Sequence, residues 1–237
     1  MKRILLTNDD GIDSEGLLRL ARVAVKYGEV WIVAPDTERS GVSHGVSFRH
    51  SFDAWEVDYP VEGVRAYACT GTPADCVRIG LLNIVKGEVD HVFSGINYGY
   101  NVASDIQYSA TAGAAFEAAF QHKHTIAFSE HSVKIHEVAD RFLEEIMAEL
   151  MEKPLEPNEI WNVNFPGCTV EECKGIQRDT KVSLGLFYKD YYKETKVDEK
   201  RTTYMVEGVR NWEAEEGTDL RAVLDDYISI GKARNIS

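Results

Sequence analysis

The feature of this chain that most restricts its fold is a regular alternation of short apolar runs with longer amphipathic segments. The apolar runs have the length and residue types of buried β-strands, and they occupy residues 3–7, 29–35, 90–95, 124–130 and 160–166. The segments between them carry apolar residues at helical spacing, and they occupy residues 14–28, 72–85, 110–122 and 133–151. Strands that alternate with helices predict an α/β fold, with a mostly parallel sheet that is covered by helices on both faces.

Local chemistry marks the start of two of these helices. Ser14 and Thr72 precede helical segments, and both residue types cap a helix by accepting a hydrogen bond from a backbone N–H. Pro73 follows Thr72 at the first helical position, where proline is favoured. We also expect Gly28 to end the first helix.

The sequence changes character after Pro154. One more strand follows, and residues 175–210 are then charged and rich in tyrosine, with an alternation that predicts a long hairpin whose turn lies near residues 197–201. Residues 219–230 have the pattern of a helix followed by a strand. We therefore predict three regions, which are an α/β core at residues 1–174, an extended hairpin arm at 175–210, and a C-terminal helix and strand at 211–237.

Composition argues against several classes of partner. The 237 residues carry a formal net charge of −13, from 26 Lys and Arg against 39 Asp and Glu, which disfavours nucleic-acid backbones and anionic membranes. No apolar run approaches the roughly 20 residues of a membrane span, and the apolar stretch Ile4–Leu6 is too short for a signal peptide. The four cysteines form no CxxC pair, so reduced thiols are expected. We expect a cytoplasmic protein that binds neither a nucleic-acid polymer nor a membrane.

Four polar clusters lie at the ends of predicted strands or in the loops that follow them. They occupy residues 7–11, 34–45, 94–101 and 108–115. In an open parallel sheet, ligands bind beyond the carboxyl ends of the strands. The clusters are far apart in the sequence, but this fold would bring them together at one edge of the sheet. We expect the functional site there.

The first cluster contains two adjacent carboxylates, Asp9 and Asp10, directly after a predicted buried strand. Two buried and ionised carboxylates need a compensating cation, because unpaired charge is costly at low dielectric. Mg²⁺ or Mn²⁺ suits such oxygen ligands, and Ser40 and Asn97 can supply the neutral oxygens. The alternative is a simple turn, since Asn, Asp and Gly all favour turns. The other polar clusters favour the metal site.

The segment Ser109–Gly113 begins an alanine-rich helix and is the best candidate for an anion site. Hydroxyl groups and free N–H groups at a helix N-terminus attract anions, and small residues let a phosphate approach the backbone. Ordinary helix capping explains the same residues when they are taken alone. Opposite a metal ion, phosphate binding is the favoured interpretation.

The loop at residues 40–45 allows a second interpretation. Its glycines, Gly41 among them, permit a tight turn, and GVSHG superficially matches the GxSxG nucleophile elbow around Ser43. This stretch does not lie at an evident strand-to-helix turn, so a serine hydrolase is a minor alternative. His44 is either a solvated loop residue or a general acid. The chain has neither GxGxxG nor GxxxxGK[ST], so dinucleotide binding and a P-loop are not indicated.

Five segments, taken in order, resemble one known family. They are ILLTNDDGIDSEGL, VAPDTERSGVSHGVSF, TGTPADCVRIGL, SGINYGYNVASDIQYSATAGAAFEAA and WNVNFP. Together they resemble the SurE family of survival-protein E phosphatases over most of residues 3–166, with a weaker similarity at residues 218–230. The resemblance implies a Rossmann-like three-layer core and a metal-dependent phosphomonoesterase, a 5′/3′-nucleotidase that acts on nucleoside monophosphates. It also implies a homodimer or homotetramer, formed through the hairpin arm and an exchanged C-terminal segment.

The matching motif positions carry the functional residues of the family onto this chain. The resemblance implies one divalent cation per subunit, Mg²⁺ or Mn²⁺ with Co²⁺ also suited, held by Asp9, Asp10, Ser40 and Asn97. The residues expected to bind substrate and phosphate are Ser40, Gly41, Asn101, Ser109, Ala110 and Thr111. The residues expected to take part in catalysis are Asp9, Asp10, Asn97 and Ser109.

Two alternatives stay open. Ala110 replaces a glycine of the family's phosphate loop, and this departure favours a nucleotide-binding regulatory protein with little turnover. A carboxylate can also accept a phosphoryl group, so Asp9 or Asp10 is an alternative covalent nucleophile. The C-terminal YISIGKARNIS also departs from the family's usual YISITPL ending.

Overall fold

A nine-stranded sheet runs through the protein, and the computed structural model describes residues 1–236. Five neighbouring strands form its parallel centre, in the order β2 (Gly28–Pro35), β1 (Lys2–Thr7), β5 (His91–Tyr98), β6 (His124–Glu130) and β7 (Glu159–Phe165). Beyond β2 the sheet continues with β4 (Arg65–Cys69) and β3 (Ala54–Val57). Beyond β7 it continues with β11 (Ile228–Arg234) and β8 (Ile176–Thr180). The predicted α/β fold with a mostly parallel sheet is confirmed.

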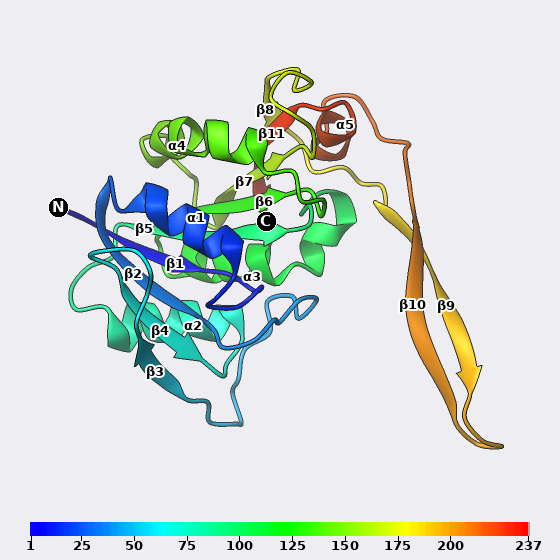
Figure 1. Cartoon of the computed structure of the whole chain (residues 1–237), viewed down its shortest axis with the longest axis horizontal. Coiled ribbons are helices and arrows are strands. Elements are labelled where there is room, and N and C mark those ends of the chain that lie inside the picture. The colour runs from blue at the N-terminus through cyan, green and yellow to red at the C-terminus, as the bar shows by residue number, and fades with distance from the viewer. Residues whose placement is uncertain (237) are drawn as a thin grey trace.

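Helices cover both faces of the sheet, which gives three layers (Figure 1). On one face α1 (Glu15–Ala24) packs against α4 (Glu137–Met151), and on the other α2 (Pro73–Ile79) packs against α3 (Ala110–Phe120). A π-helical turn at Gly80–Ile84 continues α2, a 3₁₀ turn at Ala103–Gln107 precedes α3, and α5 (Asp219–Leu224) packs on β11. Within residues 1–236, no helix combines the length and the apolar character that crossing a membrane requires.

The packing of α3 explains why its N-terminus has a fixed position. Its residues from Ala110 to Ala119 are all buried, and most of them are alanines. Small side chains let this helix lie close both to the sheet and to α2. Ser109 caps the helix by accepting a hydrogen bond of 2.9 Å from the Ala112 N–H, and the Thr111 hydroxyl donates to Asp9, which ties the first turn of α3 to the segment after β1.

The five strands and the two helix caps expected from the sequence are present, with three differences. Gly28 does not end α1 but begins β2, because α1 has already ended at Ala24. The fourth helix begins at Glu137 rather than near Val133, and Glu137 supplies an acidic residue to its first turn. β3 and β4 were not predicted; they are short and partly exposed, and they widen the sheet beyond β2.

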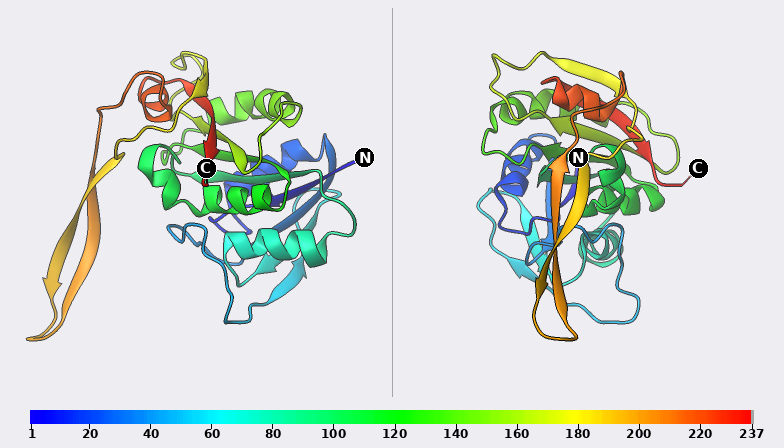
Figure 2. Two further views of the ribbon diagram at one scale, coloured as in Figure 1. Left: turned by 180° about the vertical axis from the view of Figure 1, so that it is seen from behind. Right: turned by 90° about the vertical axis from the view of Figure 1, so that its right-hand side faces the viewer.

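The hairpin arm is β9 (Tyr188–Lys196) paired with β10 (Thr202–Arg210), and it extends away from the body of the protein (Figure 2). Its turn lies at residues 197–201, as expected, where the Val197 N–H donates to the Arg201 carbonyl at 2.9 Å. The arm begins at Tyr188 and not at residue 175, because β8 within that stretch pairs with β11 in the main sheet. The helix α5 and strand β11 follow, and β11 pairs with β7 of the same chain. Exchange of this segment between subunits stays a prediction.

Candidate active site

Most of the predicted site residues meet at the carboxyl ends of β1, β2 and β5, beside the N-terminus of α3. They surround a cavity of about 290 Å³. Its lining residues are Asp9, Ser40, Gly41, Asn97, Tyr98, Asn101, Asp105, Tyr108, Ser109, Tyr188 and Asp190. The sheet order reverses between β1 and β5, and such a switch point is where open α/β sheets bind ligands.

Asp9 is the most deeply placed carboxylate of the cavity, and only 3% of its surface is exposed. The hydroxyl of Thr111 donates a hydrogen bond to Asp9 Oδ1. Burial raises the pKa of Asp9 from 3.8 to about 7, although the hydrogen bond from Thr111 opposes this shift. The neighbouring charges that act on this carboxyl, those of Asp10 and Glu38, are negative and raise its pKa further. The folded protein therefore holds a carboxylate that lacks its compensating charge.

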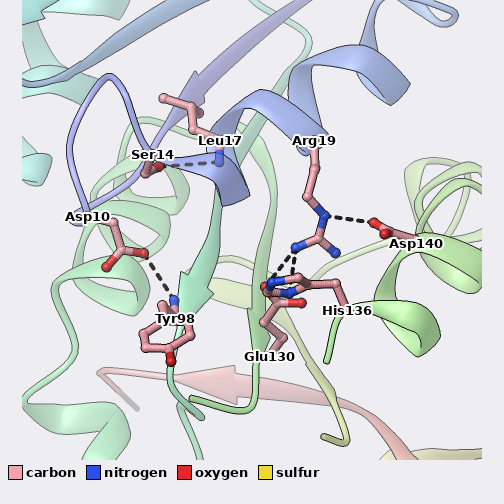
Figure 3. Close-up of polar contacts among 8 residues, drawn as sticks. All are labelled: Asp10, Ser14, Leu17, Arg19, Tyr98, Glu130, His136 and Asp140. Atoms are coloured by element: carbon pink, nitrogen blue, oxygen red, sulfur yellow. Dashed lines mark hydrogen bonds and ion pairs between the residues drawn. The ribbon is translucent and has the colours of Figure 1, made fainter. Parts of the chain in front are cut away.

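The Asp10 carboxylate contacts the backbone at the end of β5. Its Oδ2 accepts a hydrogen bond of 3.0 Å from the backbone N–H of Tyr98 (Figure 3). Burial raises the pKa of Asp10 as well. This residue lines a second cavity of about 220 Å³, which shares Tyr98 with the first. The two adjacent carboxylates thus line neighbouring cavities that share Tyr98.

The two neutral residues predicted as metal ligands are held differently. Asn97 donates its side-chain N–H to the Gly99 carbonyl at 2.8 Å, which leaves its amide oxygen available to a ligand. Ser40 is exposed, and its hydroxyl donates to Glu38 at 2.9 Å. The loop of Ser40 is tied to the first cluster because the Arg39 N–H donates to the Asp9 carbonyl at 2.7 Å. Gly41 follows with φ +75°, a conformation that glycine adopts without strain.

The predicted phosphate-binding residues take distinct places around the start of α3. Ser109 accepts its capping bond and keeps its own O–H proton for a ligand. The side chain of Ala110 is fully buried outside the cavity lining, so its methyl group does not occupy the place of a phosphate. Thr111 uses its hydroxyl on Asp9 rather than on the cavity. Asn101 is buried and donates to Ser129 at 2.7 Å.

The loop at Ser43 and His44 lies directly on α3 at Gly113, where a Cβ atom would be 2.6 Å from the Ser43 carbonyl oxygen. His44 Nε2 lies 2.8 Å from Glu117 Oε2 and faces α3 rather than the cavity. The Ser43 hydroxyl donates to the Gln107 carbonyl at 2.6 Å. In the described part of the chain, Ser43 therefore lacks the contact with a histidine base that a serine hydrolase needs.

Five further lining residues were not predicted from the sequence, namely Tyr98, Asp105, Tyr108, Tyr188 and Asp190. Tyr98 and Tyr108 stand inside the polar clusters at the ends of β5 and before α3, so their positions could have been noticed. Nothing in the sequence marks Tyr188 or Asp190, because the arm approaches the cavity only through the path of the chain after β8.

The donor set has the chemistry of a site for a hard divalent cation. Within residues 1–236, no group of three or more His, Cys, Asp or Glu side chains is arranged to hold a metal ion. Mg²⁺, however, is commonly bound through one or two carboxylates together with neutral oxygens. Asp9, Ser40 and Asn97 line one cavity and offer that combination, and Asp10 lines the adjoining cavity. The buried and uncompensated carboxylate of Asp9 is the observation that fits a bound cation.

The doubly wound fold and the oxygen-rich site at its switch point define a class of α/β proteins that bind a small ligand at the carboxyl edge of the sheet. A family model described as Survival protein SurE matches residues 4–185. The chain belongs to this SurE family.

Individual relatives agree with the family model over nearly the whole chain. A protein of Clostridium botulinum (strain ATCC 19397 / Type A) named 5′-nucleotidase SurE is 36% identical over 232 residues, covering 96% of this chain and 90% of the relative. A protein of the same name from Thermosipho melanesiensis is 35% identical over 233 residues, covering 96% and 89%. The crystal structure of the SurE protein from Aquifex aeolicus has a TM-score of 0.82 at 32% identity, covering 98% of this chain and 93% of that one.

Proposed function

We propose that this chain is a divalent-metal-dependent phosphomonoesterase that hydrolyses nucleoside 5′-monophosphates, and also 3′-monophosphates, to nucleoside and phosphate. The relatives named 5′-nucleotidase support the reaction class. The single observation that carries the proposal is the buried Asp9 carboxylate, with a pKa of about 7, in the same cavity as the capped start of α3.

Asp9, Asp10, Ser40 and Asn97 are the residues proposed to hold one Mg²⁺ or Mn²⁺ ion per subunit. When bound, such a cation supplies a Lewis acid for a phosphoryl oxygen and lowers the pKa of water. The protein's own part is to bury the Asp9 carboxylate and to hold that of Asp10 through the Tyr98 N–H. Thr111 assists by orienting the Asp9 carboxylate through its hydrogen bond.

The start of α3 is proposed to bind the phosphoryl group. The first N–H groups of a helix have no intrahelical partner, so those of Ala110 and Thr111 are available to anionic oxygens. The Ser109 hydroxyl adds a third donor at the same place. Donors that are fixed before the reaction stabilise the charge that develops on the transferring group. Ala110 is compatible with this arrangement, since its buried side chain lies outside the cavity lining.

The hairpin arm is proposed to form a homodimer or homotetramer. An isolated two-stranded ribbon is marginally stable in water, and three or more strands or a packed face are usually needed. Large apolar side chains of the arm are exposed, namely Tyr191, Tyr192, Tyr204, Met205, Val206 and Val209. Light scattering of the full chain, compared with a variant shortened at residues 190–208, tests whether the arm holds the subunits together.

The test of the reaction is phosphate release from 5′- and 3′-nucleoside monophosphates and from p-nitrophenyl phosphate. Each substrate is assayed with EDTA and with Mg²⁺, Mn²⁺ or Co²⁺. Release that requires a divalent metal supports the proposal. Release that persists in EDTA contradicts the metal requirement, and Ser43→Ala then tests the serine hydrolase alternative. Tight nucleotide binding with no release in any metal supports a regulatory protein instead.

A further inference from the structure

The active-site cavity has a closed end and an open mouth. At the closed end Asp9 and Ser109 are 3% and 8% exposed, whereas Tyr98 and Tyr108 at the mouth are 48% and 65% exposed. A scissile phosphate must reach the oxygen donors of the closed end. The leaving group of the substrate therefore occupies the mouth of the cavity, beside Tyr98 and Tyr108.

Another part of the cavity wall is formed by Asp105 and by two arm residues, Tyr188 and Asp190. Tyr188 and Asp190 are two positions apart on β9, so their side chains lie on the same face of the strand. Gly208 stands across from Asp190 in the hairpin, and a Cβ atom there would lie 2.8 Å from Asp190 Oδ1. The missing side chain leaves room for this carboxylate.

The base of the arm is fixed to the body of the protein, which gives this wall a defined position. Phe187 is buried and its carbonyl accepts a hydrogen bond of 2.7 Å from the Asn211 N–H. Arg210, at the end of β10, lies 2.9 Å from His131 Nε2.

The charge of the cavity wall is one-sided. The structure describes residues 1–236, and eleven of them line the cavity. Three of the eleven are aspartates, and none is a lysine, arginine or histidine. A cation at the closed end compensates Asp9, but the carboxylates of the mouth remain. Burial raises the pKa of Asp105, and the nearby negative charge of Asp190 raises it further. The part of a substrate that occupies the mouth thus meets two carboxylates and aromatic rings.

We propose that Asp105 and Asp190 select against any substrate whose leaving group carries a second phosphate. This inference rests on the proposed nucleotidase function. An uncharged nucleoside can donate hydroxyl and N–H hydrogen bonds to these carboxylates and can stack its base on the tyrosines. A second phosphate in the mouth is repelled by both aspartates. The arm therefore contributes a specificity-determining residue to the active site.

The experiment compares adenosine 5′-monophosphate with adenosine 3′,5′-bisphosphate in the presence of Mn²⁺. Rates are obtained by chromatography of the products, because the bisphosphate can lose either phosphate. We expect kcat/KM at low salt to favour the monophosphate by about tenfold or more, which corresponds to ~1.4 kcal/mol. Asp190→Asn should reduce this preference by about threefold, mainly through a lower KM for the bisphosphate. Asp105→Asn should act in the same direction.

Two further measurements test whether the preference for the monophosphate comes from charge repulsion or from the shape of the cavity. Raising the salt concentration from about 0.02 M to about 0.3 M should weaken the preference of the native protein more than that of Asp190→Asn, because salt screens charge but not steric contact. Glu194→Gln is the matched control, since it removes one exposed carboxylate from the same strand away from the cavity and should leave the preference unchanged.

The outcomes distinguish this inference from the proposed function. Hydrolysis of the monophosphate with an equal preference in the native protein and in both aspartate variants overturns the inference and leaves the nucleotidase function standing. A preference that salt does not change also overturns it. Calorimetric binding of both nucleotides is measured in the same series, so weaker binding of the bisphosphate supports the inference, and equal binding overturns it, even in a protein without turnover.

Discussion

Replacing Asp9 by asparagine is expected to stabilise the metal-free protein at neutral and alkaline pH. The pKa of this carboxyl is raised from 3.8 to about 7 in the folded protein, chiefly by burial. The folded protein therefore binds the proton more tightly than the unfolded chain does. The free energy of unfolding is highest when the carboxyl is protonated in both states, and it falls as the pH rises from about 4 to about 7. The total loss is ~4 kcal/mol, since one pKa unit corresponds to about 1.4 kcal/mol.

Asparagine carries no charge to desolvate, and its side-chain oxygen can still accept the hydrogen bond from Thr111. Urea denaturation in EDTA at about pH 5 and about pH 8 measures the effect, and the native protein should lose about 3 kcal/mol more than Asp9→Asn between these values. Asp13→Asn, an exposed carboxylate in the same loop, should change stability by less than about 0.5 kcal/mol. If the native protein and Asp9→Asn lose the same free energy of unfolding between the two pH values, ionisation of the buried Asp9 carboxyl does not destabilise the protein, and the reasoning is refuted.

Three further substitutions probe the supports of the site. Thr111→Val removes the donor to Asp9, so denaturation at about pH 8 in EDTA should show a loss of about 1–3 kcal/mol, and the pH of the stability loss should move upward. Gly113→Ala places a Cβ atom 2.6 Å from a backbone oxygen of the overlying loop, and we expect a loss of about 1–3 kcal/mol together with a lower kcat/KM. Arg19→Met leaves the carboxylate of Glu130 buried without its 2.7 Å ion pair (Figure 3), and thermal unfolding should show about 3 kcal/mol of destabilisation. Adding Glu130→Gln to that variant should recover part of the loss, and no recovery would contradict the role given to the charge.

The central fold follows from the sequence because its strands and helices carry strong periodic signals. The runs that became β1, β2, β5, β6 and β7 are apolar and bounded by polar residues, so local pattern was sufficient to identify them. The edge strands were not predictable in this way. β8 is the polar stretch IQRDT, and it joins the sheet only because β11 pairs with it. A strand whose stability comes from a distant partner has no local signature.

The candidate site was likewise predictable only in part. One rule, that ligands bind at the carboxyl ends of parallel strands, predicted that four residues would lie close together. They are Asp9, Ser40, Asn97 and Ser109, and all four line the cavity. The role of a nearby residue was less predictable, because it depends on contacts between elements. His44 lies in a site loop, but its ring is engaged by Glu117 of α3. The arm side of the cavity depends on the tertiary path of the chain, which no motif records.

The most direct test of the account is a calorimetric titration of Mn²⁺ into metal-free protein at about pH 6.5, in two buffers of different ionisation enthalpy. We expect one saturable site per chain, and proton release on binding, because a carboxyl with a pKa of about 7 must lose its proton to bind a cation. Asp9→Asn should abolish the proton release and weaken binding strongly. Binding of unchanged affinity in Asp9→Asn, or no saturable binding by the native protein, would contradict the central claim that the buried Asp9 carboxylate holds the cation of this site.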